Sequence, residues 1–229
     1  MTGLSFLATT PNAKEVVFFK EYALSSQYTP HDILVVVEQA LDDEPLLKAC
    51  DDIRLVYANT TYTLVPETLF DTTKLSEYLK FNAKILHGDF IAYEQVGVND
   101  LNVVYVPLVN INNFFYETFG DFQYYHAATI LLDHVLSQEQ KNMENQAYIH
   151  VHKSHFDVVL LKKGALRLCN SYSYQTPEDL AYYILFALEQ HKMNPETVAT
   201  QVFGAITEND ANFLILYTYI RNIEIAAIQ

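Results

Sequence analysis

The sequence is poor in the residues on which several kinds of functional site depend. Its 229 residues include two cysteines, six glycines and no tryptophan. The cysteines, Cys50 and Cys169, lie far apart, so they predict free thiols in a reducing cytoplasm and no disulfide framework. Few glycines mean few phosphate-binding loops, and no P-loop, GxSxG or CxxC motif occurs. Several common signatures of nucleotide binding, serine hydrolysis and thiol chemistry are therefore absent.

Positive charge is also scarce. The chain has 14 Lys and Arg against 28 Asp and Glu, a net charge of −14. The imbalance is concentrated in residues 1–145, which hold 8 basic and 20 acidic residues, whereas the remainder hold 6 and 8. An acidic surface repels phosphate backbones and anionic lipid, so we expect no nucleic-acid and no membrane partner. A protein partner, and in particular a basic one, stays open.

Long hydrophobic segments are the third absence. No apolar run approaches the roughly 20 residues of a membrane-spanning helix, and the N-terminal MTGLSFLATTPNAK lacks the basic region of a secretory signal. We therefore expect a soluble, cytoplasmic protein. What the chain does contain is material for a core: 50% of its residues are hydrophobic, 18% are charged, and 17 Tyr with 14 Phe supply large side chains.

The clearest pattern lies between Ala147 and the C-terminus. Ala147–Lys153 alternates, with Ile149 and Val151 on one face, and two further runs follow across tight turns, which predicts three antiparallel strands. Helical periodicity then follows a start signal at Thr176, Pro177 and Asp179. A strand, a second helix and a last strand complete the order. The expected elements are strands Ala147–Lys153, His155–Lys162 and Leu166–Tyr172, helix Thr176–His191, strand Thr200–Ile206, helix Asp210–Arg221 and strand Ile223–Ile228.

The first half predicts three hairpins interspersed with helices. Ser137–Gln146, SQEQKNMENQ, is the one sustained polar stretch and falls where the charge balance changes, so we place a domain boundary there. The expected hairpins join Leu4–Thr9 to Glu15–Leu24, Ile53–Ala58 to Tyr62–Val65, and Asp89–Val96 to Leu101–Pro107. The expected helices are His31–Leu41, Leu75–Phe81 and Tyr124–Leu136, with a short aromatic helix or turn at Ile111–Phe119.

Several sequence segments in both halves of the chain together resemble those of a known family. They are YIHVHKSHF (Tyr148–Phe156), NSYSYQTPEDLAYYILF (Asn170–Phe186), FGAI (Phe203–Ile206) and, less specifically, FFKEY, LVPETLF and KILHGDFIAYE in the first half. This set resembles a bacterial family of unknown function with an actin-like ATPase fold, over nearly the whole chain. The resemblance implies an α+β, α/β protein of two ribonuclease-H-like lobes, each a mixed sheet of three antiparallel strands then helix-strand units, with flanking helices. We expect the lobes at residues 1–140, without the first strand, and 147–229.

The resemblance also bears on nucleotide chemistry. Nucleotide-hydrolysing members of the actin-like superfamily carry an acidic residue and a glycine in the turn between the first two strands of each lobe. In this sequence that turn reads HVHKSHFD, without glycine, and its acid, Asp157, lies inside the second strand. The double glycine on the adenosine side is reduced to Gly204-Ala205. The side chains at 152–155 hinder the approach of phosphate to backbone amides, so these departures from the superfamily pattern predict the fold without its ATPase activity.

His150, His152 and His155 form the one cluster with the spacing of metal ligands. His150 and His152 share a strand face, and HVHKSH resembles half of the HxHxDH signature of binuclear metallohydrolases. The Asp of that signature is absent, whereas Zn²⁺ normally takes a completed tetrahedral set. We therefore interpret the histidines as residues on the more hydrated face of a strand, and a histidine metallohydrolase is an alternative.

Other candidate residues have structural interpretations. His126 and His134, eight residues apart, are expected to be partly buried, hydrogen-bonded residues of one helix, and acid pairs such as Asp42-Asp43 are expected to be surface charge. The aromatic residues crowded into 114–125 and 172–183 predict core packing, and any exposed remainder would mark a protein-binding patch.

The sequence thus predicts no catalytic residue, no cofactor and no metal. We interpret the chain as a non-catalytic protein-binding or scaffold module on a degenerate actin-like fold. A divergent nucleotide-binding ATPase or kinase and the histidine metallohydrolase are the alternatives. Titration with ATP and magnesium tests the first alternative, and metal content tests the second.

Overall fold

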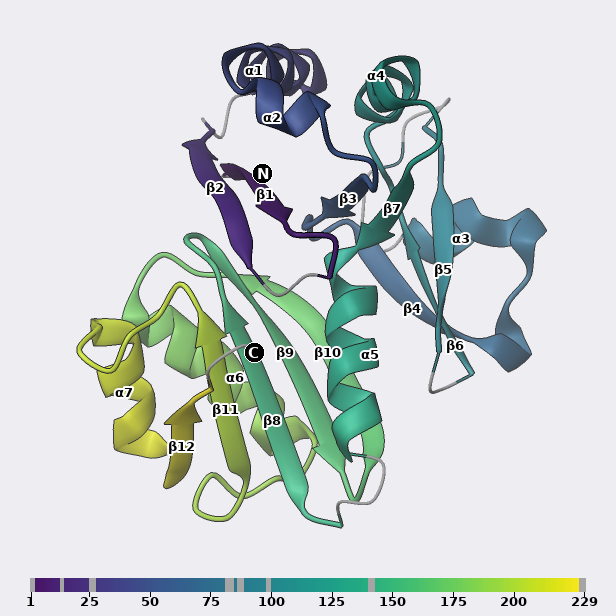
Figure 1. Cartoon of the computed structure of the whole chain (residues 1–229). Helices are drawn as coiled ribbons and strands as arrows, with labels where there is room; N and C mark the ends of the chain where they lie inside the picture. The colour runs from purple at the N-terminus through teal and green to yellow at the C-terminus, as the bar shows by residue number, and fades with distance from the viewer. Residues whose placement is uncertain are drawn as a thin grey trace. The chain divides into compact units, whose positions relative to one another are not determined.

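The computed structural model describes residues 3–12, 15–24, 28–80, 85, 89–97, 100–139 and 143–226 (Figure 1). The chain divides into two compact units. Unit 1 comprises Met1–Gln95 and Asp100–Thr129, and unit 2 comprises Val96–Asn99 and Ile130–Gln229. The expected lobe limits at residues 140 and 147 stay a prediction.

Unit 2 is built on a five-stranded sheet with the strand order β10-β9-β8-β11-β12. β8, β9 and β10 are antiparallel neighbours, and β11 runs parallel to both β8 and β12. The predicted order of three strands, helix, strand, helix and strand is confirmed. The elements are β8 (Asn145–Val151), β9 (His155–Lys162), β10 (Ala165–Ser173), α6 (Pro177–Gln190), β11 (Ala199–Gly204), α7 (Ala211–Tyr219) and β12 (Asn222–Ile225).

Local sequence explains two transitions in this unit. The turn between β9 and β10 consists of Lys163 and Gly164, whose φ angles of 53° and 75° suit a two-residue hairpin turn. α6 begins with a capping box: the Thr176 hydroxyl accepts from the Asp179 N–H, and the Asp179 carboxylate accepts from the Thr176 N–H. The predicted helix start is confirmed, whereas the expected strand end at Ile228 lies outside the described residues.

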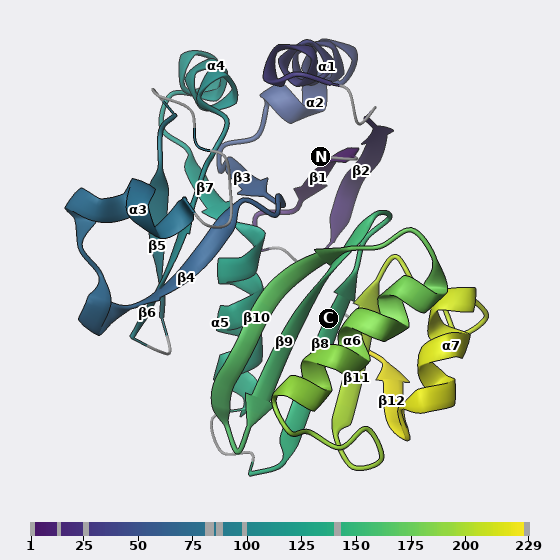
Figure 2. The ribbon, with the colours of Figure 1, turned by 180° about the vertical axis from the view of Figure 1, so that it is seen from behind.

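Helices lie on both faces of this sheet. α6 and α7 lie on one face and α5 on the other, as two opposite views show (Figures 1 and 2). α5 spans Ala127–Glu139, and its residues from Ile130 onward belong to unit 2. Val158 and Leu160 of β9 pack with α6 and α7 in the main apolar cluster. Strand alternation sends Val159 and Leu161 the opposite way, where both are also fully buried.

Unit 1 contains three small sheets over its described residues. β1 pairs with β2 antiparallel, β3 pairs with β7 in parallel, and β6 lies between β4 and β5. The elements are β1 (Gly3–Thr9), β2 (Val16–Ala23), α1 (Pro30–Asp43), α2 (Pro45–Lys48), β3 (Arg54–Tyr57), β4 (Tyr62–Pro66), α3 (Leu75–Leu79), β5 (Ala92–Val96), β6 (Leu101–Tyr105), α4 (Val109–Phe119) and β7 (Gln123–His126), with short 3₁₀ helices at Glu67–Leu69 and Thr72–Lys74.

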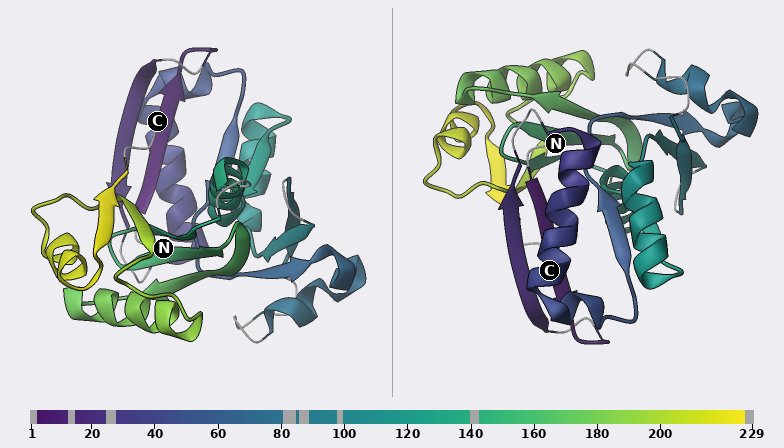
Figure 3. Two further views of the ribbon diagram at one scale, coloured as in Figure 1. Left: turned by 90° about the horizontal axis from the view of Figure 1, so that it is seen from below. Right: turned by 90° about the horizontal axis from the view of Figure 1, so that it is seen from above.

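The opening hairpin of unit 1 packs one face against α1, which lies across the two purple strands in Figure 3. Phe6 and Phe18 from that face join Ile33 and Val37 of α1 in one apolar cluster. Alternation along the strands explains this arrangement, because every second side chain of β1 and β2 faces the helix. The predicted hairpin is confirmed.

Two predictions for unit 1 are wrong. β3 and β4 do not pair with each other: Asn59 Oδ1 accepts from the Thr61 N–H at 2.8 Å in the connecting loop, and the two strands pair with β7 and β6 instead. The helix expected from Tyr124 begins only at Ala127, because Gln123–His126 forms β7. Adjacent tyrosines favour extended backbone, and this local preference precedes the helical periodicity.

The remaining differences concern element ends. α5 continues to Glu139 and β8 begins at Asn145, so the polar linker is shorter than predicted at both ends. α3 is observed at Leu75–Leu79, and its expected end at Phe81 lies outside the described residues. Within the described ranges, no helix combines the length and apolar character needed to cross a bilayer. Cys50 and Cys169 form no disulfide bond.

Candidate functional site

The candidate site is a row of four side chains that crosses the sheet of unit 2. Phe203 on β11 lies opposite His150 on β8. His150 in turn lies opposite Asp157 on β9, and Asp157 lies opposite Ser171 on β10. Residues directly opposite in neighbouring strands project from the same face of a sheet. The register therefore collects an imidazole, a carboxylate and a hydroxyl from three adjacent strands.

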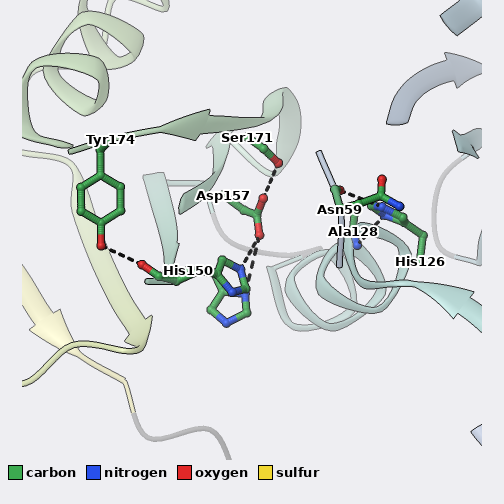
Figure 4. A network of polar contacts seen from close by, with 8 residues as sticks. Asn59, His126, Ala128, His150, Asp157, Ser171 and Tyr174 are labelled. Atoms are coloured by element: carbon green, nitrogen blue, oxygen red, sulfur yellow. Dashed lines mark hydrogen bonds and ion pairs between the residues drawn. The ribbon is translucent and has the colours of Figure 1, made fainter. Parts of the chain in front are cut away.

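Asp157 is the centre of this row. Its Oδ2 lies 3.0 Å from His152 Nε2 and 3.7 Å from His150 Nδ1. Its other oxygen, Oδ1, accepts a hydrogen bond from the Ser171 hydroxyl. Figure 4 shows the serine on one side of the carboxylate and the imidazole rings on the other. One carboxylate oxygen is thus directed at two histidines.

The three histidines of the cluster pack ring against ring. The His152 ring centroid lies 4.0 Å from that of His150 and 4.2 Å from that of His155. His150 also stacks on Phe203, with centroids 4.9 Å apart. The side chains of His150, His152 and Asp157 are 26%, 21% and 14% exposed. The cluster is therefore mostly enclosed by protein and still reaches solvent.

Backbone contacts hold the segment that carries the histidines. The Tyr174 hydroxyl donates to His152 O at 2.7 Å, and the Ala205 N–H donates to Val151 O at 2.7 Å. Gly204 has a φ of 97°, and a Cβ at this position would lie 2.3 Å from Val151 O and 2.7 Å from His150 Cδ2. Glycine is therefore required for β11 to approach His150 this closely.

The surroundings shift the pKa values of the cluster. Burial raises the pKa of Asp157, but hydrogen bonds from His152 and Ser171 outweigh burial, so the net pKa of this carboxyl lies below its usual range. Burial and the neighbouring His152 lower the pKa of His150 to about 4, and the same two causes lower the pKa of His155. At neutral pH, Asp157 is therefore ionised while His150 and His155 are neutral.

These groups could hold a cation. One ligand atom from each of His150, His152 and Asp157 lies within 4.8 Å of the other two. Within the part of the chain that the structure describes, this is the one group of three His, Cys, Asp or Glu side chains that meets this condition. Imidazole nitrogens with a carboxylate oxygen are ligands that Zn²⁺ and related transition metals accept.

Sequence reasoning found the histidines but not their carboxylate. The structure brings His150, His152 and His155 together, and Asp157 joins them from the next strand. A signal was present, because a hairpin centred on the expected turn at Lys153-Ser154 places residue 150 opposite residue 157. The contributions of β10 and β11 to the row, by contrast, depend on strand registers that no local pattern specifies.

Comparison with known proteins identifies the family. A family model described as "Protein of unknown function (DUF3822)" matches residues 1–223. The chain belongs to this family. No curated protein matches the sequence.

Solved structures show the fold of the DUF3822 chain. A Bacteroides thetaiotaomicron protein with actin-like ATPase fold and unknown function gives a TM-score of 0.85 at 17% identity, over 98% of this chain and 87% of that one. A chain of the PilM-PilN type IV pilus biogenesis complex gives a TM-score of 0.62 at 10% identity, over 98% of this chain and 85% of that one. The actin-like ATPase fold expected from the sequence motifs is thus confirmed.

The two other histidines singled out in the DUF3822 sequence differ from their predicted settings. His126 ends β7 and is 1% exposed, so it does not share a helix with His134, which is exposed on α5. His126 Nε2 lies 3.1 Å from Asn59 O, and Nδ1 accepts from the Ala128 N–H at 3.1 Å (Figure 4). Backbone groups engage both ring nitrogens, so His126 has a structural role.

Proposed function

We propose that the DUF3822 chain is a protein-binding module that uses the actin-like fold as a scaffold, without nucleotide hydrolysis. The observation that carries the proposal is an exposed apolar surface on α6 and α7. Five large apolar or aromatic side chains of these helices are 45–64% exposed: Tyr182, Phe186, Leu214, Tyr217 and Tyr219. Exposed groups of this kind are typical of protein-interaction surfaces.

The aromatic side chains of this surface are already ordered by their neighbours. Tyr182 and Phe186 lie one turn apart on α6, and their rings stack with centroids 6.1 Å apart. On α7, Tyr217 contacts the buried Phe213 at the same centroid distance of 6.1 Å. Tyrosine and phenylalanine supply much contact area for little loss of side-chain entropy, which favours them at interface centres.

The charges around this surface indicate the chemistry of the partner. α6 and α7 contain no Lys or Arg, whereas Glu178, Asp179 and Glu189 lie on α6. Residues 146–229, which include both helices, hold 8 Asp and Glu against 6 Lys and Arg. A protein segment that combines apolar side chains with Lys or Arg would complement this surface. One of the similar solved structures is a PilM-PilN complex, so the fold occurs in a protein assembly.

The turn between β8 and β9 supports the second part of the proposal. Nucleotide-hydrolysing members of the superfamily that this chain resembles carry a glycine in this turn, next to the phosphate. Here the turn consists of His152, Lys153 and Ser154. The His152 ring stacks on the His155 ring, with centroids 4.2 Å apart. Side chains at these positions hinder phosphate from reaching the backbone amides. We place the protein in the cytoplasm, where cysteines outside disulfide bonds, such as Cys50 and Cys169, persist.

Crosslinking tests the proposed surface. A photo-crosslinking residue at Leu214 is expected to capture a protein in lysate of the source organism, and the purified partner is expected to bind through a basic, apolar segment. The double substitution Tyr182→Ser and Phe186→Ser should weaken that binding at least about tenfold, as for interface aromatic residues. Leu69→Ser is the matched control, because Leu69 is 69% exposed and lies outside the surface. Equal binding by the double variant, or an equal loss in the control, would contradict the proposal.

Calorimetric titration with ATP and magnesium tests the absence of nucleotide chemistry. We expect no binding heat and no phosphate release from the purified chain. Micromolar binding with hydrolysis would establish the ATPase alternative instead.

A further inference from the structure

We propose that His150, His152 and Asp157 form a binding site for one divalent transition-metal cation, with Zn²⁺ as the best fit. The site lies on one face of the β8–β9 hairpin in unit 2. It is independent of the protein-binding surface on α6 and α7, so either proposal can fail without the other.

The distances within the cluster suit a metal ion without rearrangement of the backbone. Zn²⁺ lies about 2.0–2.2 Å from nitrogen and oxygen ligands, so tetrahedral ligand atoms are separated by about 3.4 Å. The separations from Asp157 Oδ2, 3.0 Å to His152 Nε2 and 3.7 Å to His150 Nδ1, lie on either side of that value. Small side-chain rotations can therefore bring both nitrogens and the oxygen to bonding distance of one ion.

The groups around the three ligands hold them in position. Ser171 donates to Asp157 Oδ1, which leaves Oδ2 for the ion. Phe203 stacks on the His150 ring, and Tyr174 holds the backbone carbonyl of His152. Such supporting contacts are typical of metal sites, where they fix the orientation of ligating imidazoles and carboxylates.

The donor set and its exposure indicate the class of ion. Two imidazoles and one carboxylate suit Zn²⁺ or Fe²⁺, whereas Ca²⁺ and Mg²⁺ prefer oxygen ligands alone. Three protein ligands leave at least one coordination position for water or for an atom of another molecule. The partly exposed side chains, between 14% and 26%, give that position access to solvent.

Metal titration of the full chain tests the site. Tag-free protein, treated with chelator and then dialysed, is titrated at neutral pH with CoCl₂ followed by absorbance and with ZnCl₂ followed by calorimetry. We expect each chain to bind one equivalent of Co²⁺ and to show the absorption bands of low-symmetry Co²⁺ coordination. One equivalent of Zn²⁺ should displace the Co²⁺ and abolish these bands. Asp157→Asn should weaken binding at least about tenfold, since even outer-shell changes at metal sites cost 10–100-fold. His152→Gln should have a similar effect and serves as a second variant should Asp157→Asn fail to fold, as judged by circular dichroism.

His134→Ala is the matched control, because His134 is exposed on α5 and lies outside the cluster. We expect wild-type affinity and an undiminished absorption spectrum for this variant. Three results would overturn the site: no stoichiometric binding by the wild type, wild-type binding by folded Asp157→Asn or His152→Gln protein, or an equal loss in His134→Ala.

Discussion

His126 in unit 1 and the histidine cluster in unit 2 place the same side chain in opposite situations. His126 is 1% exposed, and a backbone carbonyl and a backbone N–H engage its two ring nitrogens. His150 and His152 are partly exposed and direct one nitrogen each at the oxygen of a carboxylate. A histidine whose nitrogens are both occupied by backbone can only stabilise the fold. A histidine that shares a carboxylate with a neighbour has the arrangement of a ligand.

The largest effect is expected from Gly204→Ala, which acts on the backbone beside the cluster. The added Cβ would meet Val151 O at 2.3 Å and His150 Cδ2 at 2.7 Å, and φ is 97°. We expect a loss of roughly 3–4 kcal/mol in the free energy of unfolding, because both backbone strain and a steric clash are introduced. Urea denaturation measures the loss, and hydrogen exchange should place it in β8 and β11. A change below 1 kcal/mol would mean that β11 does not hold His150 as described.

His126→Leu tests the structural role of the buried histidine in unit 1. The substitution leaves Asn59 O and the Ala128 N–H without the imidazole. We expect a loss of roughly 2–3 kcal/mol, because a buried backbone N–H and a partly buried backbone carbonyl lose their partner. Hydrogen exchange should show weaker protection in β7 and unchanged protection in β9.

His134→Leu is the control for that measurement. His134 is exposed, so its substitution should change stability by no more than about 0.5 kcal/mol. Equal losses of stability in His126→Leu and His134→Leu would show that the backbone contacts of the buried His126 ring add nothing to stability.

Asp157→Asn in metal-free protein tests how much the histidine cluster of unit 2 contributes to stability. The amide keeps an acceptor for the Ser171 hydroxyl but removes the charge that faces His152 at 3.0 Å. We expect a loss of roughly 1–2 kcal/mol at neutral pH, less than for His126→Leu, because the cluster is partly hydrated. Thermal unfolding in the presence of chelator measures it. A loss greater than that of His126→Leu would indicate that the cluster is primarily structural.

Apart from the control, the smallest loss of stability is expected from a local motif that occurs in both units. Thr176 begins α6 and Thr29 begins α1, and each forms a capping box with an aspartate three residues later. Thr176→Ala should lower stability by about 1 kcal/mol, and Thr29→Ala should have an effect of similar size. Denaturant midpoints of both variants check this. A clear difference between them would show that surroundings, and not the motif, determine the contribution of the cap.

Unit 2 could be predicted more fully than unit 1, for reasons visible in particular residues. The start signal of α6 lies within four residues, at Thr176, Pro177 and Asp179, and the apolar run within His155–Lys162 indicates β9 without reference to any other segment. The strands Arg54–Tyr57 and Tyr62–Pro66 were also found, but their partners were not, because β7 and β6 lie far along the chain. Pairing between distant strands depends on packing that a local pattern does not contain.

The candidate site, too, could be predicted only in part from the sequence. The spacing of His150 and His152 was visible in the sequence, since side chains two residues apart share a strand face. The expected turn also implied that residue 157 lies opposite residue 150. The hydrogen bond from the Ser171 hydroxyl, which holds the Asp157 carboxylate, was not visible because it comes from β10.

The amino-acid sequence by itself determined the order of strands and helices in unit 2 and the family resemblance, because periodicity, caps and turns act over a few neighbouring residues. Only the tertiary structure decided which side chains of β10 and β11 join the histidine cluster, which strands pair in unit 1 and which aromatic side chains stay exposed. Those outcomes depend on contacts between distant segments, whose energies exist only once the chain has folded.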